Sequence, residues 1–338
     1  MAFSDIGWCS YTLNLHAGCL MVDAACRNCY AQRMANRLAA MGQEKYQGLT
    51  RKTADNKAVW SGQYNNATDD FFTWPFREQT PHLVFVDSMA DFFLEAISDA
   101  DFLRAWGALA LARQHTFMVL SKRPEHGLEQ IRRFHLEIPA HIWIGASVAE
   151  KARVHRLDTL REFPARIRFL SVEPLIEDLG PLDLTDIHLV IAGGESGPGH
   201  RPYQVQWARS LREQCREQGV AFYHKQYGHA SNNPLYRDHG AVVGRQLEID
   251  MAREQGFDIP PDPRHWPSGG CSIDGRFHFE MPEPGRSLLS NHGKPAQAAP
   301  GWIDTTWKRQ QIDADLAAGR ISRGTAARLK QLVTLGRV

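Results

Sequence analysis

Short apolar runs alternate with helical patterns from residue 82 to residue 225, and this alternation constrains the fold more than any other feature. The runs span 82–87, 115–121, 141–147, 166–171, 187–192 and 220–225, and helical patterns cover 101–113, 125–134, 149–162 and 204–217. Strands that are apolar at nearly every position are typical of a parallel sheet buried on both faces. With a weak first strand at 7–14, we predict an α/β fold: a full or partial (β/α) barrel of six to seven parallel strands with an irregular and helical C-terminal extension.

The barrel is expected to occupy residues 1–229. Residues 230–300 are rich in Pro and Gly and indicate an irregular extension over the barrel. Residues 301–338 form a basic tail that we expect to be helical, with seven Lys and Arg against three Asp from residue 304 onward. That tail could contact phosphates, with Trp302 and Trp307 stacking on bases, or could dock on the barrel as a helical hairpin with a solvated charged face.

Composition narrows the classes of protein further. The net charge of +1 over 338 residues excludes a globally basic surface, so contact with nucleic acid would need a local patch. No apolar run reaches the roughly 20 residues of a membrane helix, and the N-terminus lacks a signal-peptide pattern. We therefore expect a cytoplasmic protein with no membrane partner.

Polar residues follow the strands repeatedly, where parallel α/β folds build their ligand sites. Each polar residue could instead cap the helix that follows it. Because polar residues recur after so many strands, a shared ligand-binding site is the favoured interpretation. The candidates are Ser88, Asp91, Lys122, Arg123, Ser147, Glu150, Glu173, Gly193, Gly194, Glu195, Lys225 and Gln226.

Three cysteines cluster after the weak first strand: Cys19, Cys26 and Cys29. In a reducing compartment such a cluster favours metal or redox chemistry over disulfides. One possibility is a structural zinc site completed by His16 or Cys9. Another, that the cysteines are core residues of a binding protein without catalysis, is disfavoured because the intervening residues are polar.

A set of motifs in residues 5–230 resembles a known family. The three-cysteine loop ending in Cys29-Tyr30 is followed by VDSMADFF, LSKRP, FLSVEP, IAGGESGPGHRP and HKQYG. The combination is similar to the phage-associated three-cysteine-motif proteins, a family of unassigned function placed beside the radical S-adenosylmethionine (radical SAM) enzymes. The sequence departs from the common radical SAM pattern, because six residues separate the first two cysteines and the aromatic residue follows the last one.

The resemblance implies that Cys19, Cys26 and Cys29 hold a 4Fe–4S cluster, leaving one iron open to S-adenosylmethionine. An electron from the cluster would then cleave the sulfonium and release a 5′-deoxyadenosyl radical. It also implies that Ser88 and Asp91 contact the methionine end, Ser147 and Glu150 the ribose, and Gly193, Gly194 and Glu195 the adenine or methionyl backbone. The residues left to face a substrate are Lys122, Arg123, Glu173, Lys225 and Gln226.

We thus expect a radical SAM enzyme acting on a nucleobase, nucleotide or nucleic acid, with an electron donor such as flavodoxin or ferredoxin as partner. The alternative is a zinc-stabilised nucleic-acid-binding protein without catalysis. The polar groups after successive strands favour the enzyme, because a binding module has no need to enclose a cofactor and a substrate.

Overall fold

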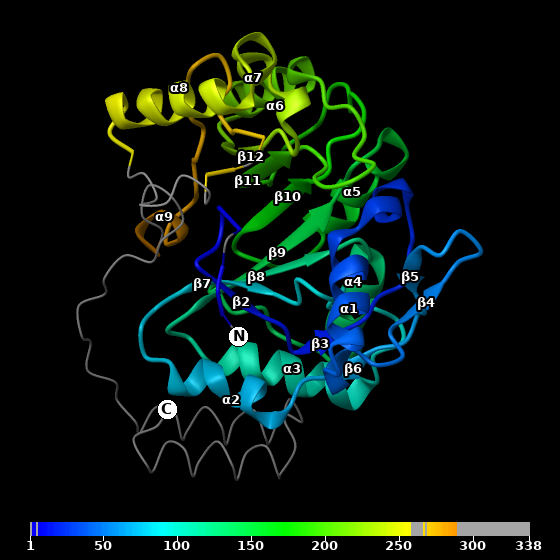
Figure 1. The fold of residues 1–338 in the computed structure, drawn as a ribbon. Coiled ribbons are helices and arrows are strands. Elements are labelled where there is room, and N and C mark those ends of the chain that lie inside the picture. The colour runs from blue at the N-terminus through cyan, green and yellow to red at the C-terminus, as the bar shows by residue number, and fades with distance from the viewer. Residues whose placement is uncertain (1, 5, 258–265, 268, 289–338) are drawn as a thin grey trace.

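The computed structural model describes residues 2–4, 6–257, 266–267 and 269–288. At its centre lies one sheet of eight strands in the order β1-β2-β7-β8-β9-β10-β11-β12. Neighbours from β2 to β12 pair in parallel, whereas β1 pairs antiparallel with β2. The sheet curls into a half-barrel with helices around it (Figure 1). The predicted partial barrel of six to seven parallel strands is confirmed.

The six clearest predicted strands form within two residues of their expected limits. They are β7 (Leu83–Val86), β8 (Thr116–Ser121), β9 (Ile142–Ser147), β10 (Arg168–Val172), β11 (Leu189–Gly193) and β12 (Ala221–Gln226). The weak first strand is β2 (Tyr11–Leu13), preceded by β1 (Ala2–Phe3). The connecting helices are α3 (Asp99–Leu111), α4 (Pro124–Arg133), α5 (Arg156–Arg161) and α6 (Val205–Gln218), with the 3-10 turn η3 (Lys151–Arg153) ahead of α5.

A long insertion between β2 and β7 carries the cysteines. It contains β3 (His16–Ala17), η1 (Ala24–Asn28), α1 (Tyr30–Ala40), η2 (Glu44–Tyr46), β4 (Thr50–Lys52), β5 (Ala58–Trp60), β6 (Asn65–Asn66) and α2 (Asp69–Arg77). The strands pair antiparallel as β3 with β6 and β4 with β5. The buried face of α1 presents Ala31, Gln32 and Ala35, and the Gln32 side chain accepts a hydrogen bond from the Trp60 amide (2.9 Å). This side-chain bond ties α1 to the β4–β5 ladder.

Two apolar layers cover the sheet because strand side chains alternate between its faces. The larger layer packs between the sheet and the surrounding helices. A smaller layer fills the concave inside with large side chains that include Trp8, Phe85, Trp143, Phe169 and Tyr223. Most of the apolar side chains of the concave layer lie along the strands themselves. Polar side chains occur at the carboxyl ends of the strands.

The C-terminal extension differs in part from the prediction. Within the segment expected to be irregular lie the helices α7 (Pro234–His239), α8 (Ala241–Glu254) and α9 (Gly285–Leu288). Helix α7 starts where it does because the Asn233 side chain accepts from the Leu235 amide and Pro234 takes the first helical position. Farther on, the His224 amide of β12 donates to the carbonyl of His278, so the extension covers the sheet edge. The predicted tail at 301–338 lies outside the described residues.

Candidate functional site

A pocket of about 490 Å³ opens at the carboxyl ends of the parallel strands, and we call it the central pocket. The structure brings most of the predicted site residues to its wall: Cys19, Cys26, Cys29, Ser88, Asp91, Lys122, Ser147, Glu173, Gly194, Glu195, Lys225 and Gln226. Arg123, Glu150 and Gly193 do not line it. Residues separated by up to about two hundred positions in the chain therefore share one cavity, as expected for the carboxyl-end face of a parallel α/β fold.

The cysteines lie on residues 18–29, the cysteine loop, whose first residue has to be glycine. Gly18 has φ +108°, and a Cβ there would lie 2.2 Å from the Gln63 carbonyl oxygen. Beyond it, Cys19 and Cys29 are half-buried and Cys26 is buried, with Cys29 directly preceding α1. The backbone at Gly18 thus turns the chain so that all three cysteines line the central pocket.

Burial disfavours the thiolate forms of Cys19 and Cys26. It raises the pKa of Cys19 to about 12, with Asp91 adding to the rise, and it raises the pKa of Cys26. Cys19 also experiences the charges of Cys26 and Cys29, so the three sulfur atoms are electrostatic neighbours. A cationic iron centre would stabilise the thiolates, and cysteine thiolates are the ligands that such clusters use. The chemistry of the donor set, three cysteine thiols lining one pocket, is the kind that an iron–sulfur cluster would use.

A single zinc ion is the alternative occupant for the three cysteines. Tetrahedral zinc with Zn–S bonds of about 2.3 Å requires sulfur atoms roughly 3.8 Å apart. Within the described ranges, no group of three His, Cys, Asp or Glu side chains is close enough to hold one metal ion. Neither of the expected fourth ligands, His16 and Cys9, lines the central pocket with the three cysteines.

Three arginines from different strand-to-helix connections hold the backbone of the cysteine loop, and we call them the arginine clamp. Arg123 donates to the Leu20 carbonyl (2.6 Å), Arg153 to that of Val22 (2.9 Å), and Arg201 to that of Ala24 (2.9 Å). Alternate carbonyls are thus bound by guanidinium groups that follow β8, β9 and β11. Charged donors make stronger hydrogen bonds than neutral ones, so the loop is held in shape by protein contacts alone.

Asp91 and Arg123 form a buried pair at the root of this clamp. Their side chains are 6% and 4% exposed, and Arg123 Nη1 lies 3.0 Å from Asp91 Oδ2. Asp91 also accepts from the Ser121 hydroxyl (2.6 Å) and from the Lys122 amide (3.0 Å). The Arg123 guanidinium forms ion pairs with Asp91 and Glu95 and a hydrogen bond with the cysteine loop. Arg123 therefore positions the loop, and it does not line the central pocket.

Glu195 has a similar supporting position on the opposite side of the loop. Arg201 binds both of its carboxylate oxygens, and the Asn28 amide donates to Oε2 (3.0 Å). Burial opposes ionisation of Glu195, but the hydrogen bonds from Arg201 and Asn28 outweigh it and hold the pKa below its usual value. Glu195 is therefore an anion that fixes the distal end of the cysteine loop while lining the pocket.

Lys122 places a positive charge beside the cysteines. Its ammonium donates to the Ser147 hydroxyl (2.6 Å) and acts electrostatically on Asp23 and Cys26. Asp23 itself pairs with buried Arg156 (2.8 Å), and although burial opposes it, the positive charges of Lys122 and Arg156 lower its pKa. Lys122 and Ser147 thus offer a donor and a hydroxyl on the wall next to Cys26.

Glu173 and Lys225 form a second polar pair in the pocket; Glu173 directly follows β10, and Lys225 lies near the carboxyl end of β12. Lys225 Nζ lies 2.9 Å from Glu173 Oε1, and the Trp8 indole donates to Oε2 (3.0 Å). Trp8 packs at 4.7 Å between ring centroids on Phe85, and both rings line the pocket. This part of the wall combines flat apolar surface with a paired donor and acceptor.

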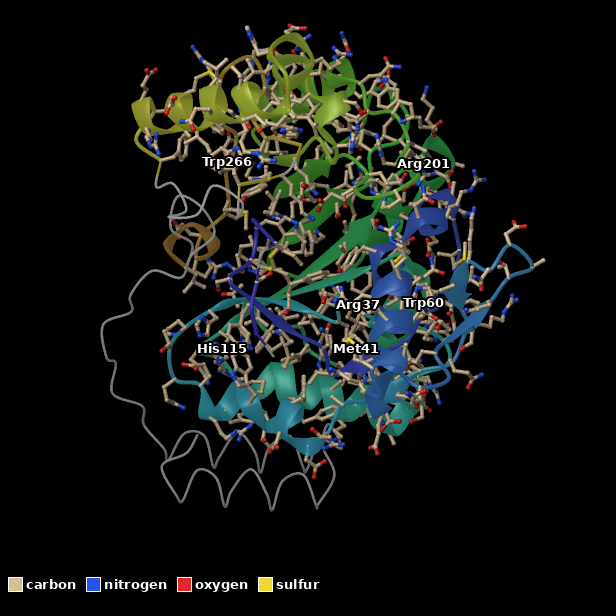
Figure 2. The ribbon with its side chains drawn as sticks, viewed as in Figure 1. Arg37, Met41, Trp60, His115, Arg201 and Trp266 are labelled. Atoms are coloured by element: carbon tan, nitrogen blue, oxygen red, sulfur yellow. The ribbon has the colours of Figure 1, made fainter. Side chains whose placement is uncertain are left out.

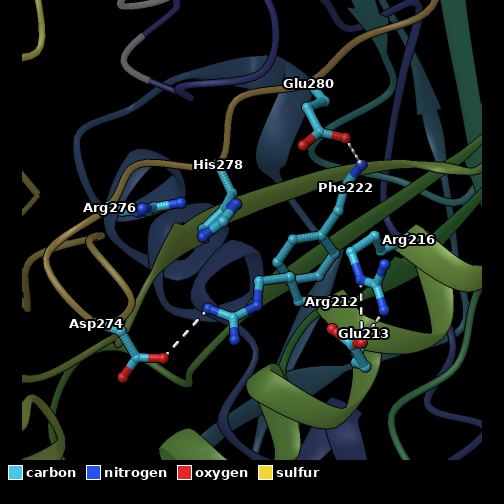
Figure 3. Close-up of a pocket in the computed structure, with 8 residues that line it drawn as sticks. All are labelled: Arg212, Glu213, Arg216, Phe222, Asp274, Arg276, His278 and Glu280. Carbon is cyan, nitrogen blue, oxygen red and sulfur yellow. Dashed lines mark hydrogen bonds and ion pairs between the residues drawn. The ribbon is translucent and has the colours of Figure 1, made fainter.

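A separate pocket of about 430 Å³ lies between α6, β12 and the segment 274–280 (Figure 3). Its charges are largely matched internally: Arg212 pairs with Asp274 (3.2 Å), Arg216 pairs with Glu213, and Glu280 accepts from the Phe222 amide (3.1 Å). No cysteine lines it. Its paired charges give no reason to place the chemistry there.

Sequence reasoning missed several residues that shape the site. Arg201 lies in the GHRP part of a motif that the resemblance had already marked, so a signal for it was present. Arg153, Arg156 and Trp8 carry no such signal, because each meets its partner across more than 100 positions or from an ordinary helical or apolar context. Only the three-dimensional arrangement identifies them.

Comparison with known proteins gives a family without an assigned activity. Residues 3–256 match the family described as "Protein of unknown function (DUF5131)". The chain belongs to this family. Its description mentions neither S-adenosylmethionine nor phage, so both of those links rest on the resemblance of motifs. No curated protein and no solved structure matches the chain.

None of the helices in the described part of the chain has the length and apolar character needed to cross a membrane.

Proposed function

We propose that this DUF5131 protein is a radical SAM enzyme whose central pocket takes a 4Fe–4S cluster and S-adenosylmethionine. The observation that carries the proposal is the convergence of three cysteines and a polar wall on one cavity at the carboxyl ends of the strands. Cys19, Cys26 and Cys29 would hold the cluster, leaving one iron without a protein ligand. The cluster would supply the electron that cleaves the sulfonium of S-adenosylmethionine.

The chain's own residues divide the remaining work. Ser88, Ser147 and Gly194 line the central pocket and would contact the cofactor, and a Cβ on Gly194 would clash with the Tyr227 carbonyl at 2.1 Å. Asp91 and Glu195 hold the cysteine loop through Arg123 and Arg201. Glu150 and Gly193 do not line the central pocket, so any role of these residues toward the ribose or adenine would be indirect.

We infer a nucleobase, nucleotide or nucleic acid as the substrate. The Glu173–Lys225 pair offers an acceptor and a donor, and Trp8 and Phe85 offer flat apolar surface beside it. A planar, hydrogen-bonding ring suits such a wall. Lys122 lies nearer to Cys26 and could stabilise negative charge that develops on the substrate.

We also infer a cytoplasmic location. All six cysteines are free thiols in the structure, which is the state expected in a reducing compartment.

Anaerobic reconstitution with iron and sulfide tests the proposal. The loaded full-length protein should bind iron and, with S-adenosylmethionine and dithionite, release 5′-deoxyadenosine. Cys19→Ala, Cys26→Ala and Cys29→Ala should each lose the cluster, whereas Cys215→Ala, which changes a buried thiol outside the pocket, should keep it. Because the arginine clamp holds the loop, Cys26→Ala should unfold at nearly the wild-type temperature.

Three results would contradict the proposal. The protein could take up zinc and refuse iron, the iron-loaded protein could leave S-adenosylmethionine intact, or loss of one cysteine could unfold the domain as in a structural zinc site. Metal analysis, product chromatography and circular dichroism separate these outcomes.

A further inference from the structure

Exposed apolar side chains gather around the cysteine loop. Of eight large apolar residues exposed in the described part of the chain, five lie on the loop or on α1: Leu20, Met21, Tyr30, Met34 and Met41. Met41 is 64% exposed and Tyr30 is 49% exposed. Clustering of this kind on a folded chain marks an interaction surface more often than chance exposure does.

Three of these residues, Tyr30, Met34 and Met41, form one stripe along α1 and its C-cap. Positions 30, 34, 37 and 41 recur at the spacing of successive α-helical turns, so they share one face, opposite the buried Ala31 and Ala35. Arg33 flanks the stripe, and Figure 2 shows Arg37 and Met41 on this helix. We call residues 20, 21, 27, 30, 33, 34, 37 and 41 the α1 face.

The charge of the α1 face has a single sign. Arg27, Arg33 and Arg37 are exposed, and none of the three pairs with a carboxylate in the described part of the chain. Residues 24–43 contain no Asp or Glu, and Asp23 is already paired with Arg156. The α1 face is thus rich in Met, Tyr and Arg and lacks Lys, Asp and Glu. This composition is typical of protein–protein interfaces.

We propose that the α1 face is the docking surface for a small acidic electron-donor protein of the flavodoxin or ferredoxin class. The inference rests on the proposed function, because it assigns the electron donor that the central pocket would require. The helical part of the face begins at Tyr30, the residue after Cys29, and Tyr30 is fixed there by donating its hydroxyl hydrogen to the Ser88 carbonyl (2.8 Å). A docked donor would be oxidised by one electron, and the cluster that the three cysteines would hold would be reduced by that electron.

Charge complementarity selects this occupant over others. A second copy of this chain would bring arginine against arginine, and residues 304–338 have an excess of positive charge in the sequence. Both would be repelled, whereas an acidic face would be attracted and steered. Electron-transfer complexes are small interfaces of under about 1,200 Å², which a three-turn helix and its loop can supply.

Binding of the full-length, iron-loaded protein to an acidic flavodoxin and to a plant-type ferredoxin tests the proposal. Isothermal titration at low ionic strength should give binding to one of them that weakens as salt rises. Arg33→Glu with Arg37→Glu should weaken it about tenfold or more, and Met34→Asp should weaken it as well.

Matched controls change the same kinds of residue elsewhere. Arg166→Glu with Arg276→Glu reverses two exposed charges away from α1, and Val242→Asp alters the exposed apolar patch on α8. Both should bind the donor as the wild type does. Equal binding by wild type and Arg33→Glu/Arg37→Glu, or equal loss in the controls, would overturn the proposal.

A 20-nucleotide DNA, single-stranded or duplex, is the competing probe. If DNA binds, the Arg33→Glu/Arg37→Glu variant abolishes that binding, and neither acidic protein binds, then the face is a nucleic-acid surface and the proposal is wrong. Iron content and dithionite-driven 5′-deoxyadenosine release are measured on the same samples. Normal values with failed docking overturn the docking surface alone, whereas intact docking without iron or product overturns the proposed function.

Discussion

At the scale of single residues, two positions determine the shape of the cysteine loop. Gly18 allows the close approach to the Gln63 carbonyl, and Asp91 neutralises the buried guanidinium of Arg123. Neither is a predicted metal ligand, yet the three cysteines depend on both for their positions. Each therefore makes a prediction that is independent of any cofactor.

We expect Gly18→Ala to destabilise the fold by several kcal/mol, because a Cβ would combine an unfavourable φ with a clash against backbone. Gly42→Ala is the matched control, since Gly42 has φ +80° but nothing within 4 Å of the added Cβ. It should cost about 1 kcal/mol. Urea unfolding measures both, and equal losses would show that the close approach at Gly18 is unimportant.

Replacing Asp91 by Asn should cost about 3–5 kcal/mol, because it leaves the buried charge of Arg123 without a counterion. Asp70→Asn, which breaks the exposed pair of Asp70 with Arg77, should change the free energy of unfolding by less than about 1 kcal/mol. A stable Asp91→Asn protein that only loses affinity for S-adenosylmethionine would instead favour direct cofactor binding by Asp91.

At the scale of elements, the arginine clamp joins three connections of the half-barrel to one loop. Arg153→Gln and Arg201→Gln should each remove a charged donor from a loop carbonyl. We expect faster amide hydrogen exchange in residues 20–29 and slower uptake of iron, with little change in the sheet. Arg132→Gln, which breaks an exposed pair with Glu162, should leave the exchange of the loop unchanged.

The elements also explain what the sequence could predict. Strands such as Ile142–Ser147 are buried at every position, so their apolar runs stand out, and the polar residues that follow them necessarily meet at one face. Short pieces such as β3 and β6 have two residues each and carry no periodic signal. The clamp was unpredictable because its partners lie 103 to 177 positions apart, and the same arginines would look like surface charges in a linear sequence.

At the scale of the whole molecule, buried histidines link stability to pH. Burial lowers the pKa of His224 to about 4, and its ring is held between the Tyr203 hydroxyl and the Cys271 carbonyl. The folded state keeps this ring neutral below pH 6.5, while the unfolded chain takes up a proton there. Stability should therefore fall as pH drops from 6.5 toward 4, by up to about 1.4 kcal/mol per pH unit for this residue.

His224→Gln tests that linkage. The variant should be less stable than the wild type at pH 7, and its stability should depend less steeply on pH between 6.5 and 4.5. Urea titrations at several pH values measure the slope, and identical slopes would show that His224 does not titrate across this range on unfolding.

The arginine clamp sets an order of events during synthesis. Ala24 leaves the ribosome 177 residues before Arg201, the residue that binds its carbonyl. At about 5–20 residues per second, the cysteines wait roughly 10–35 s in a nascent chain before the clamp can close. The loop that emerges first is thus among the last parts to reach its final shape, and a truncated chain ending before β11 presents the three thiols without the geometry that would receive a cluster.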